Sequence, residues 1–281
     1  MLYVPGCNRR YLEKAKSLNV DSIILDLGDP ILIDAKEVSR DNVVDFLNQD
    51  CYGKREVVVR VNDFDSPWGL DDIKAVAHLN PDAILFPNVE SREHVEQAIN
   101  ELDKAGGQDV PIMVMIESPI AVLHAEEIAS ASDRIQCMIL ATSDLISQLH
   151  ARSTQNRVAI LHSLSTVILA ARAYGHAVVD GIHSNLKDTE SFEYACRMGR
   201  DMGFDGKSLV HPDQLPYAND AYTPKAEEIE HAQAVITALA EANASGRGTV
   251  VVNDRLVEHH HVRAAERLLR LNELIMELNH D

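Results

Sequence analysis

The chain has few cysteines and no long apolar run. Four cysteines occur among 281 residues, without a CxxC pair or zinc-like spacing, at Cys7, Cys51, Cys137 and Cys196. This scatter argues against a disulfide framework or a structural metal and favours a reducing, cytoplasmic setting. No stretch is apolar for long enough to cross a bilayer, and residues 1–5 lack the basic and apolar regions of a secretion signal. We therefore expect no membrane span and no export.

Basic residues are also scarce. The chain has 26 Lys and Arg against 44 Asp and Glu, a formal net charge of −18. Phosphate contacts dominate the affinity of proteins for nucleic acids, so this balance argues strongly against a nucleic-acid partner. A small anion remains a possible ligand wherever a local arginine or a bound cation outweighs the distant charges, because salt screens interactions beyond roughly 10 Å.

Apolar segments alternate with helical segments along most of the chain. A run such as Ile112–Ile116 lacks the polar alternation of a half-exposed strand and indicates a strand buried on both faces, typical of parallel sheets. The candidate strands are 22–27, 56–61, 83–86, 111–116, 136–141, 176–179 and 205–210, and the clearest helices are 9–18, 34–47, 91–102, 157–174 and 189–202. With a short eighth strand near 221–222, this order predicts an α/β fold, a (β/α)8 TIM barrel. A doubly wound open sheet is the alternative, although a nucleotide-binding one would normally carry a Gly-rich motif after its first strand.

The barrel is expected to span residues 1–242, with a last helix that has Thr223 as its cap and Pro224 at its first helical position. Small and turn-forming residues at 243–248 predict a break, followed by a strand at 249–252 and a helix at 262–278. The resulting C-terminal extension, 243–281, is too short for a core of its own, so we expect it to pack on the barrel or on a neighbouring subunit. The tract His259–His261 is expected to be a solvated loop.

Charged residues lie at the ends of several predicted strands. Glu117 and Asp144 follow the fourth and fifth strands, Asp26 and Asp29 surround the end of the first, and Arg60 ends the second. Barrel enzymes keep their sites at this end of the strands. Two carboxylates suit a hard divalent cation, and an arginine beside them suits a substrate carboxylate. The alternative is a set of helix caps and salt bridges that close the top of the barrel.

Seven motifs occur in an order that resembles the HpcH/HpaI aldolase family, which includes the citrate lyase β-subunit and the malyl-CoA and citramalyl-CoA lyases. The motifs are YVPG (3–6), ILDLGD (24–29), VRVN (59–62), IESP (116–119), DG (180–181), GFDGK (203–207) and VHP (210–212). The resemblance covers nearly the whole chain. It implies a (β/α)8 barrel, usually a homotrimer, that cleaves a β-hydroxyacyl thioester reversibly into an acetyl thioester and a keto acid.

The same resemblance implies roles for individual residues. Mg²⁺ would be held by Glu117 and Asp144, and Arg60 would bind the carboxylate of the keto acid. The segment Arg255–Glu258 resembles the family's tail motif Arg-Met-Val-Asp, in which an acid from a neighbouring subunit acts at the acetyl carbon. We therefore expect Arg60, Asp29 and Glu258 to be catalytic, although Glu258 could equally be an exposed charge before the last helix.

Basic residues of the first helix are the candidates for binding the CoA phosphates. Arg9 and Lys14 lie in the segment where relatives use basic side chains for this purpose. The alternative is that both are simply solvated, as basic residues on a surface helix commonly are. His211, at the end of the seventh predicted strand, is expected to be structural or to line the thioester channel.

The chain departs from the family pattern at several positions. Gly28 stands where the family commonly has glutamate, Asn88 where it has lysine, and Ser143 where it has glutamate. We therefore favour a Mg²⁺-dependent lyase of the citramalyl-CoA or malyl-CoA type. The alternatives are a citrate lyase β-subunit proper, a catalytically impaired barrel that serves as a binding or assembly subunit, and an aldolase acting on free keto acids.

Overall fold

The computed structural model describes residues 1–244 and 249–278 and divides the chain into two compact units. The first unit is Met1–Tyr222 and the second is Thr223–Asp281, and each is described by itself. The helix that we expected to end the barrel at residue 242 therefore groups with the C-terminal residues. Within the predicted break at 243–248, residues 245–248 lie outside the described part of the chain.

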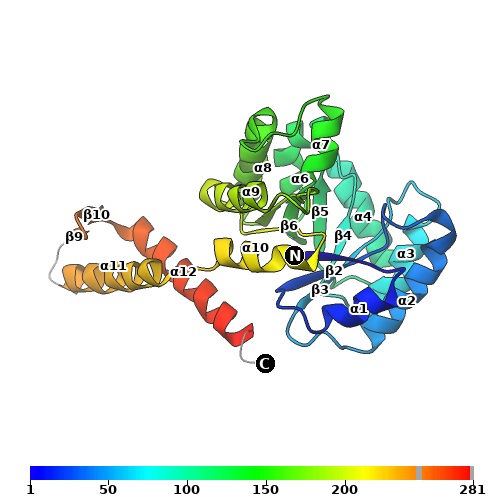
Figure 1. Ribbon diagram of the computed structural model, residues 1–281, viewed down its shortest axis with the longest axis horizontal. Helices are drawn as coiled ribbons and strands as arrows, with labels where there is room; N and C mark the ends of the chain where they lie inside the picture. The colour runs from blue at the N-terminus through cyan, green and yellow to red at the C-terminus, as the bar shows by residue number, and fades with distance from the viewer. Residues whose placement is uncertain (245–248, 279–281) are drawn as a thin grey trace. The chain divides into compact units, whose positions relative to one another are not determined.

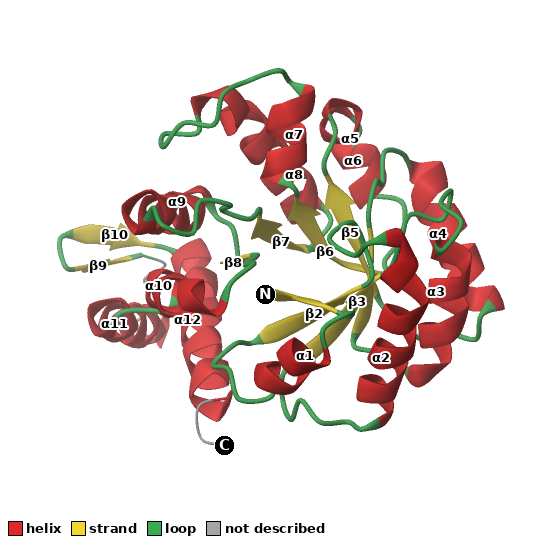
Figure 2. Cartoon of the chain, turned by 45° about the vertical axis from the view of Figure 1, so that its right-hand side comes forward, coloured by secondary structure: helices red, strands yellow, loops and turns green. Residues whose placement is uncertain are grey.

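The first unit is built on a curled sheet of eight parallel strands that follow one another in chain order (Figures 1 and 2). The strands are β1 (Leu2–Pro5), β2 (Ser22–Asp26), β3 (Glu56–Arg60), β4 (Ala83–Phe86), β5 (Ile112–Ile116), β6 (Ile135–Leu140), β7 (Ala177–Asp180) and β8 (Gly206–Lys207). A segment containing helix separates each strand from the next, as parallel pairing requires. The predicted α/β class and parallel strand order are confirmed.

Helices surround the sheet in Figure 2. They are α1 (Arg9–Ala15), α2 (Lys36–Asn48), α3 (Gly69–Val76), α4 (Arg92–Lys104), α5 (Pro119–Leu123), α6 (Ala125–Ala129), α7 (Thr142–Gln148), α8 (Leu161–Ala173), α9 (Thr189–Met202) and α10 (Leu215–Tyr222). Single 3-10 turns are η1 (Ile33–Ala35), η2 (Ala77–Leu79), η3 (Val158–Ile160) and η4 (Pro212–Gln214). None of the helices in the described part of the chain is both long and apolar enough to span a membrane.

The predicted strand set is wrong at one place. Residues 221–222 end helix α10 and form no strand, whereas the strand that completes the set is β1, at the N-terminus. Its four residues are too few to show a periodicity, and Pro5 lowers their strand propensity. An isolated parallel bridge joins Leu2 to Leu209, just after β8, and the Tyr3 backbone N–H donates to the Leu209 carbonyl at 2.9 Å.

Alternate residues of strands β2 to β7 belong to two different cores. Ile23 and Leu25 of β2 pack in the large core that includes residues of the surrounding helices, whereas Ile24 packs in a smaller core with residues such as Met113 and Met115 of β5. This alternation follows from the two-residue period of a strand, and it defines the inner face of the curled sheet. Residues two positions beyond an inner residue point to the same side, which places Asp26 and Glu117 on the inner face.

The second unit consists of two helices and a hairpin. Helix α11 (Ala226–Ala244) leads to the antiparallel strands β9 (Val250–Val252) and β10 (Arg255–Val257), and helix α12 (His259–Leu278) follows. These elements share a small apolar core that includes Val235, Leu239 and Val257. The prediction of a loop at His259–His261 is wrong about the backbone conformation, which is helical. The three histidines are exposed, but they form the first turn of α12.

Candidate active site

A buried ion pair lies where β2 and β3 end. Asp26 and Arg60 are partners in the register of these strands, so their side chains leave the sheet side by side on its inner face. The Arg60 guanidinium donates from Nε and Nη2 to the two oxygens of Asp26, at 2.7 and 2.8 Å. Burial opposes the charge on Arg60, but the adjacent carboxylate outweighs this effect and raises the pKa of the guanidinium. Arg60 is therefore held as a fixed cation, with Nη1 still directed elsewhere.

The Nη1 atom of Arg60 faces the mouth of the sheet. It lies 3.8 Å from a carboxylate oxygen of Asp29 and 3.9 Å from the sulfur of Met115. The Asp29 side chain is 92% exposed, so this contact with Arg60 is weak. The ring of Tyr3 lies 5.1 Å from the guanidinium carbon and covers another side of the cation. Arg60 can thus present its Nη1 group to an anion without giving up its two bonds to Asp26.

Gly28 provides the space that the guanidinium occupies. A Cβ at this position would lie 2.9 Å from the Cζ, Nε and Nη2 atoms of Arg60. The loop that carries Gly28 is supported by Lys36, whose ammonium donates to the carbonyls of Leu27 and Gly28 at 2.9 and 2.8 Å and to the Asn62 side chain at 2.5 Å. Replacing the family's glutamate by glycine thus has a steric consequence as well as the loss of a carboxylate.

Glu117 follows β5 and is nearly buried. Its position two residues after Met115 places it on the inner face of the sheet. Burial raises the pKa of its carboxyl to about 7, although a hydrogen bond donated by the Asn88 backbone N–H lowers this pKa. That bond is 2.6 Å long and comes from a backbone in the left-handed region, with φ of 53° at Asn88. Asparagine tolerates this conformation better than most residues.

Asp144 lies in the first turn of α7 and is exposed. Its negative charge contributes to the raised pKa of Glu117, as does that of Asp29, whereas the positive charge of Arg60 lowers it. Asp144, Asp29 and Arg60 are therefore all close enough to Glu117 to shift the pKa of its carboxyl. The carboxylate pair fits a hard divalent cation, because such an ion would offset the unfavourable charge of buried Glu117, and Mg²⁺ usually keeps several waters beside one or two carboxylates.

A cavity of about 540 Å³ opens beside Arg60 and Asp144, and Glu117 lies outside the set of residues that line it. Asp26, Asp29, Arg60 and Asp144 contribute to its wall, and Met115 and Ile139 make part of it apolar. This volume suits a small organic acid or part of a larger ligand. A larger cavity, of about 1070 Å³, includes Glu56 and Pro111, which precede or begin strands and therefore belong to the opposite end of the sheet. We place the site in the smaller cavity because barrel sites occur where strands end.

The two basic residues predicted on the first helix lie outside the wall of this cavity. Arg9 on α1 donates to Asn42 at 3.0 Å and pairs with Asp45, so its guanidinium already has partners on α2. Lys14 is exposed on α1, and neither basic residue contributes to the wall of the cavity. Glu258 follows β10 in the second unit and is exposed.

His211 has a structural place in the described fold. It caps η4, where its ring nitrogen accepts a hydrogen bond from the backbone N–H of Asp213 at 3.2 Å. The backbone N–H of His211 in turn donates to the side-chain oxygen of Gln214. This agrees with the structural option of the prediction.

Comparison with known proteins places this chain in a family. The profile of the HpcH/HpaI aldolase/citrate lyase family matches residues 1–212. A (3S)-malyl-CoA thioesterase of Cereibacter sphaeroides is 42% identical over 98% of this chain and 94% of the relative. The chain belongs to the HpcH/HpaI aldolase/citrate lyase family.

Two further relatives extend the comparison within the HpcH/HpaI family. The citrate lyase subunit beta of Leuconostoc mesenteroides is 35% identical over 96% of this chain and 92% of that protein. The structure of CitE from Mycobacterium tuberculosis, in complex with magnesium, acetoacetate and coenzyme A, is similar with a TM-score of 0.77 and 27% identity over 97% of each chain. The relatives thus include lyase subunits and thioesterases.

Several residues that support Arg60 and its loop in this HpcH/HpaI family member were not assigned a role from the sequence. Asp26 was placed at the mouth of the sheet, and the alternative of salt bridges there did not specify its pairing with Arg60. Asn62 was noted only as part of the VRVN motif, and Lys36 was not selected at all. A signal for Asp26 existed, because it and Arg60 both close apolar runs that become neighbouring strands. No comparable signal marks Lys36, whose three acceptors include two backbone carbonyls of a loop.

Proposed function

We propose that this chain is a Mg²⁺-dependent carbon–carbon lyase that cleaves a short β-hydroxyacyl-CoA into acetyl-CoA and a keto acid. The observation that carries the proposal is the position of Arg60. Asp26 fixes this cation beside the Glu117 and Asp144 carboxylates and at the wall of a cavity of about 540 Å³. A fixed cation beside a potential metal site suits a hydroxy or keto acid, because the cation can hold the carboxylate while the metal holds the hydroxyl or keto oxygen.

Glu117 and Asp144 are the residues that would hold Mg²⁺. Bound there, the ion would supply Lewis acidity at the hydroxyl oxygen that becomes the keto oxygen. The neighbours CitE with magnesium and acetoacetate, and the citrate lyase beta subunit with oxaloacetate and magnesium, both from Mycobacterium tuberculosis, support this choice of metal.

The other proposed roles concern binding and proton transfer. Nη1 of Arg60 would bind the substrate carboxylate, and exposed Asp29, 3.8 Å from Nη1, would act as a catalytic residue next to that carboxylate. When a base takes the hydroxyl proton, the bond between the hydroxyl-bearing carbon and the acetyl carbon breaks, and its electron pair forms the enolate of the acetyl thioester. Glu258 would then donate a proton to the acetyl carbon. Arg9 and Lys14 would contact the CoA phosphates.

The finer architecture is also part of the proposal. We infer that the curled sheet closes into a (β/α)8 barrel, which is supported by the bridge between Leu2 and Leu209. We propose a homotrimer in which the C-terminal extension, 243–281, packs on the barrel or on a neighbouring subunit and so delivers Glu258. The cysteine pattern supports a cytoplasmic location.

Hydrolysis of malyl-CoA is a second candidate function. It is favoured by the relatives named (3S)-malyl-CoA thioesterase, which reach 42% identity, against 35% for the citrate lyase subunit beta of Leuconostoc mesenteroides. A thioesterase would need the same recognition of a short acid and CoA, but water would attack the thioester carbonyl and the carbon–carbon bond would remain.

One experiment separates these reactions. The protein is incubated with Mg²⁺ and, separately, with malyl-CoA, citramalyl-CoA or citryl-CoA, and acetyl-CoA and free CoA are quantified by chromatography. A lyase releases acetyl-CoA with a keto or aldehyde acid, whereas a thioesterase releases free CoA with the intact hydroxy acid. Arg60→Lys should lower turnover with either product, because lysine cannot keep the two bonds to Asp26 and bind a carboxylate.

The outcomes also test the remaining alternatives. Cleavage of citryl thioester alone would favour a citrate lyase β-subunit, and cleavage of a free hydroxy acid would favour an aldolase. Absence of turnover together with absence of Mg²⁺ binding, even with pyruvate present, would refute the proposal and favour a binding or assembly subunit.

A further inference from the structure

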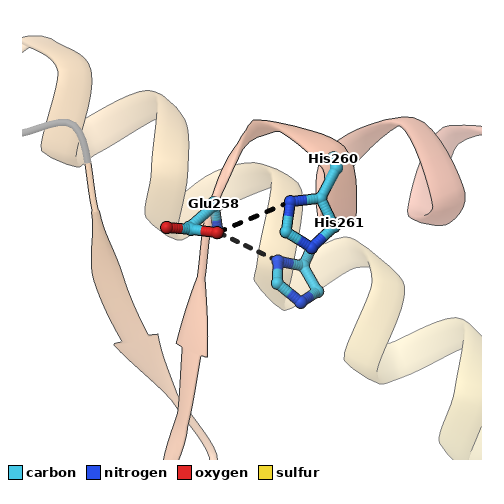
Figure 3. A group of neighbouring side chains, drawn as sticks. All are labelled: Glu258, His260 and His261. Atoms are coloured by element: carbon cyan, nitrogen blue, oxygen red, sulfur yellow. Dashed lines mark hydrogen bonds and ion pairs between the residues drawn. The ribbon is translucent and has the colours of Figure 1, made fainter.

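The second unit contains a cluster of metal-ligating side chains that the proposed reaction does not use as such. Glu258, His260 and His261 lie where β10 ends and α12 begins, and all three are exposed (Figure 3). One ligand atom from each lies within 4.8 Å of the others. Within residues 1–244 and 249–278, this is the one group of three or more His, Cys, Asp or Glu side chains that meets this spacing.

One backbone contact and one side-chain contact already orient these side chains. The N–H of Glu258 donates to Nδ1 of His261 at 3.0 Å, and Nδ1 of His260 lies 3.5 Å from a carboxylate oxygen of Glu258. The two imidazole rings lie side by side, with centroids 3.8 Å apart. Figure 3 shows both rings turned toward Glu258. Local chain geometry therefore gathers the three ligands without help from distant residues.

These spacings are close to those of a metal site. Bonds of roughly 2.0–2.1 Å place the ligands of a tetrahedral zinc ion about 3.3 Å apart. The pair formed by His260 and Glu258, at 3.5 Å, already matches this separation. His261 would have to move by an ångström or two and exchange its bond from the Glu258 N–H for a bond to the metal, which an exposed side chain can do.

We propose that Glu258, His260 and His261 form a transition-metal site that binds Zn²⁺, or Cu²⁺ or Ni²⁺ of similar preference. Two imidazoles and one carboxylate are the ligand set that such ions favour, whereas Mg²⁺ prefers oxygen alone. The carboxylate also offsets the partial positive charge of the N-terminus of α12, which by itself disfavours a cation. Three protein ligands leave one coordination position for water.

The site has a regulatory consequence, and this part rests on the proposed function. Glu258 is the side chain that we assign to protonation of the acetyl carbon. A carboxylate bound to Zn²⁺ cannot donate that proton, so occupation of the cluster should inhibit turnover while Glu117 and Asp144 remain available to Mg²⁺. The chain would then bind two metals with opposite effects at two separate sets of ligands.

The binding test uses the full chain, freed of metal by dialysis against a chelator. Zn²⁺ is titrated in competition with a coloured chelator, in the presence of millimolar Mg²⁺. We expect His260→Ala and His261→Ala each to weaken the high-affinity binding at least ~10-fold, since each removes a direct ligand. His259→Ala is the matched control, because His259 belongs to the same tract but lies outside the cluster, and it should leave binding unchanged.

A second measurement uses the unaltered protein, so it does not depend on the folding of variants. Carbethoxylation of histidine by diethyl pyrocarbonate is mapped by mass spectrometry with and without Zn²⁺. Zn²⁺ should protect His260 and His261 but not His259. Equal zinc affinity of the unaltered chain and the His260→Ala/His261→Ala double variant, or equal labelling with and without Zn²⁺, would overturn the proposal.

The inhibition is tested separately in the acetyl-CoA assay. Zn²⁺ should lower turnover of the unaltered chain and spare the His260→Ala/His261→Ala double variant. If the chain binds Zn²⁺ at the cluster but cleaves no thioester at all, the proposed function fails and the metal site stands. If turnover is normal and equally sensitive to Zn²⁺ in both proteins, the regulatory role fails.

Discussion

Replacing Glu117 by glutamine should stabilise the metal-free protein at neutral pH and abolish its Mg²⁺ binding. Burial raises the pKa of this carboxyl from 4.5 to about 7. Between these pH values the folded chain binds a proton that the unfolded chain releases. The stability contributed by Glu117 is therefore full below about pH 4.5 and is lost as the pH rises to about 7. Glutamine has nearly the same shape, carries no charge and can still accept the Asn88 N–H.

The size of the effect follows from the two pKa values. At ~1.4 kcal/mol per pH unit, a change from 4.5 to about 7 makes ionisation of Glu117 cost ~3 kcal/mol of stability at pH 8. At pH 5 the corresponding cost is below ~1 kcal/mol, because the folded carboxyl is then almost fully protonated. For a unit of about 200 residues, ~3 kcal/mol corresponds to roughly 6–12 °C in Tm.

The assay is thermal unfolding followed by circular dichroism in the presence of a chelator, at pH 5 and pH 8. Glu117→Gln should melt several degrees above the unaltered chain at pH 8 and close to it at pH 5. Asp144→Asn is the control, because Asp144 is exposed, so its neutralisation should change Tm far less while it also weakens Mg²⁺ binding. A variant that melts below the unaltered protein at pH 8 would refute the assignment of Glu117 as a buried, destabilised carboxylate.

Three further predictions concern the same site. Because the Glu117 pKa is about 7 and a metal competes with the proton, Mg²⁺ should bind ~10-fold more weakly at pH 6 than at pH 8 by calorimetry; a flat profile would contradict this. Asp26→Asn leaves buried Arg60 without a charged partner and should lower the free energy of unfolding in urea by ~3–5 kcal/mol, whereas Asp29→Asn, at an exposed side chain, should change it by less than ~1 kcal/mol. Gly28→Ala would place a Cβ 2.9 Å from the Arg60 guanidinium and should raise KM at least ~10-fold. The control is Gly206→Ala, because a Cβ at that position meets no atom within 4 Å. Equal KM values for both variants would argue against the role of Gly28.

Uniform apolarity made the buried strands visible in the sequence. Strands β2 to β7 each carry four or more residues of which most are apolar, and their predicted positions agree with the structure within one or two residues at each end. Strand β8 is formally only Gly206–Lys207, so the prediction at 205–210 located it but overstated its length. Strand β1 escaped because a run of four residues at the chain end carries no period, and its role depends on pairing with β2 from another part of the chain.

The second unit was harder to predict, because its elements depend on one another. Strand β10 is three residues long, and two of them are exposed, so no sequence pattern marks it. It forms by pairing with β9, after which the chain enters α12 directly at His259. The histidine tract resembles a loop in isolation. The hairpin places it in a helical first turn, next to the carboxylate that precedes it.

The candidate site shows the same division between local and tertiary information. Strand ends located Glu117, Arg60 and Asp26 correctly, because a parallel sheet brings all its carboxyl ends to one edge. What the sequence could not provide was the state of the side chains: that Asp26 holds Arg60 through two bonds, or that burial raises the pKa of Glu117. Both depend on packing from elements far apart in the chain.

Gly28 shows how a departure from a family pattern changes meaning once packing is known. In the sequence it is the loss of a carboxylate, which suggests impaired metal binding. In the structure it is also the position against which the Arg60 guanidinium lies, too close for a Cβ. A side chain there requires the Arg60 guanidinium or the loop that carries residue 28 to shift, so the identity of residue 28 and the position of the arginine are coupled. Activity in this chain is therefore better judged by whether Arg60 can reach a substrate carboxylate from its present position than by the number of acids that remain.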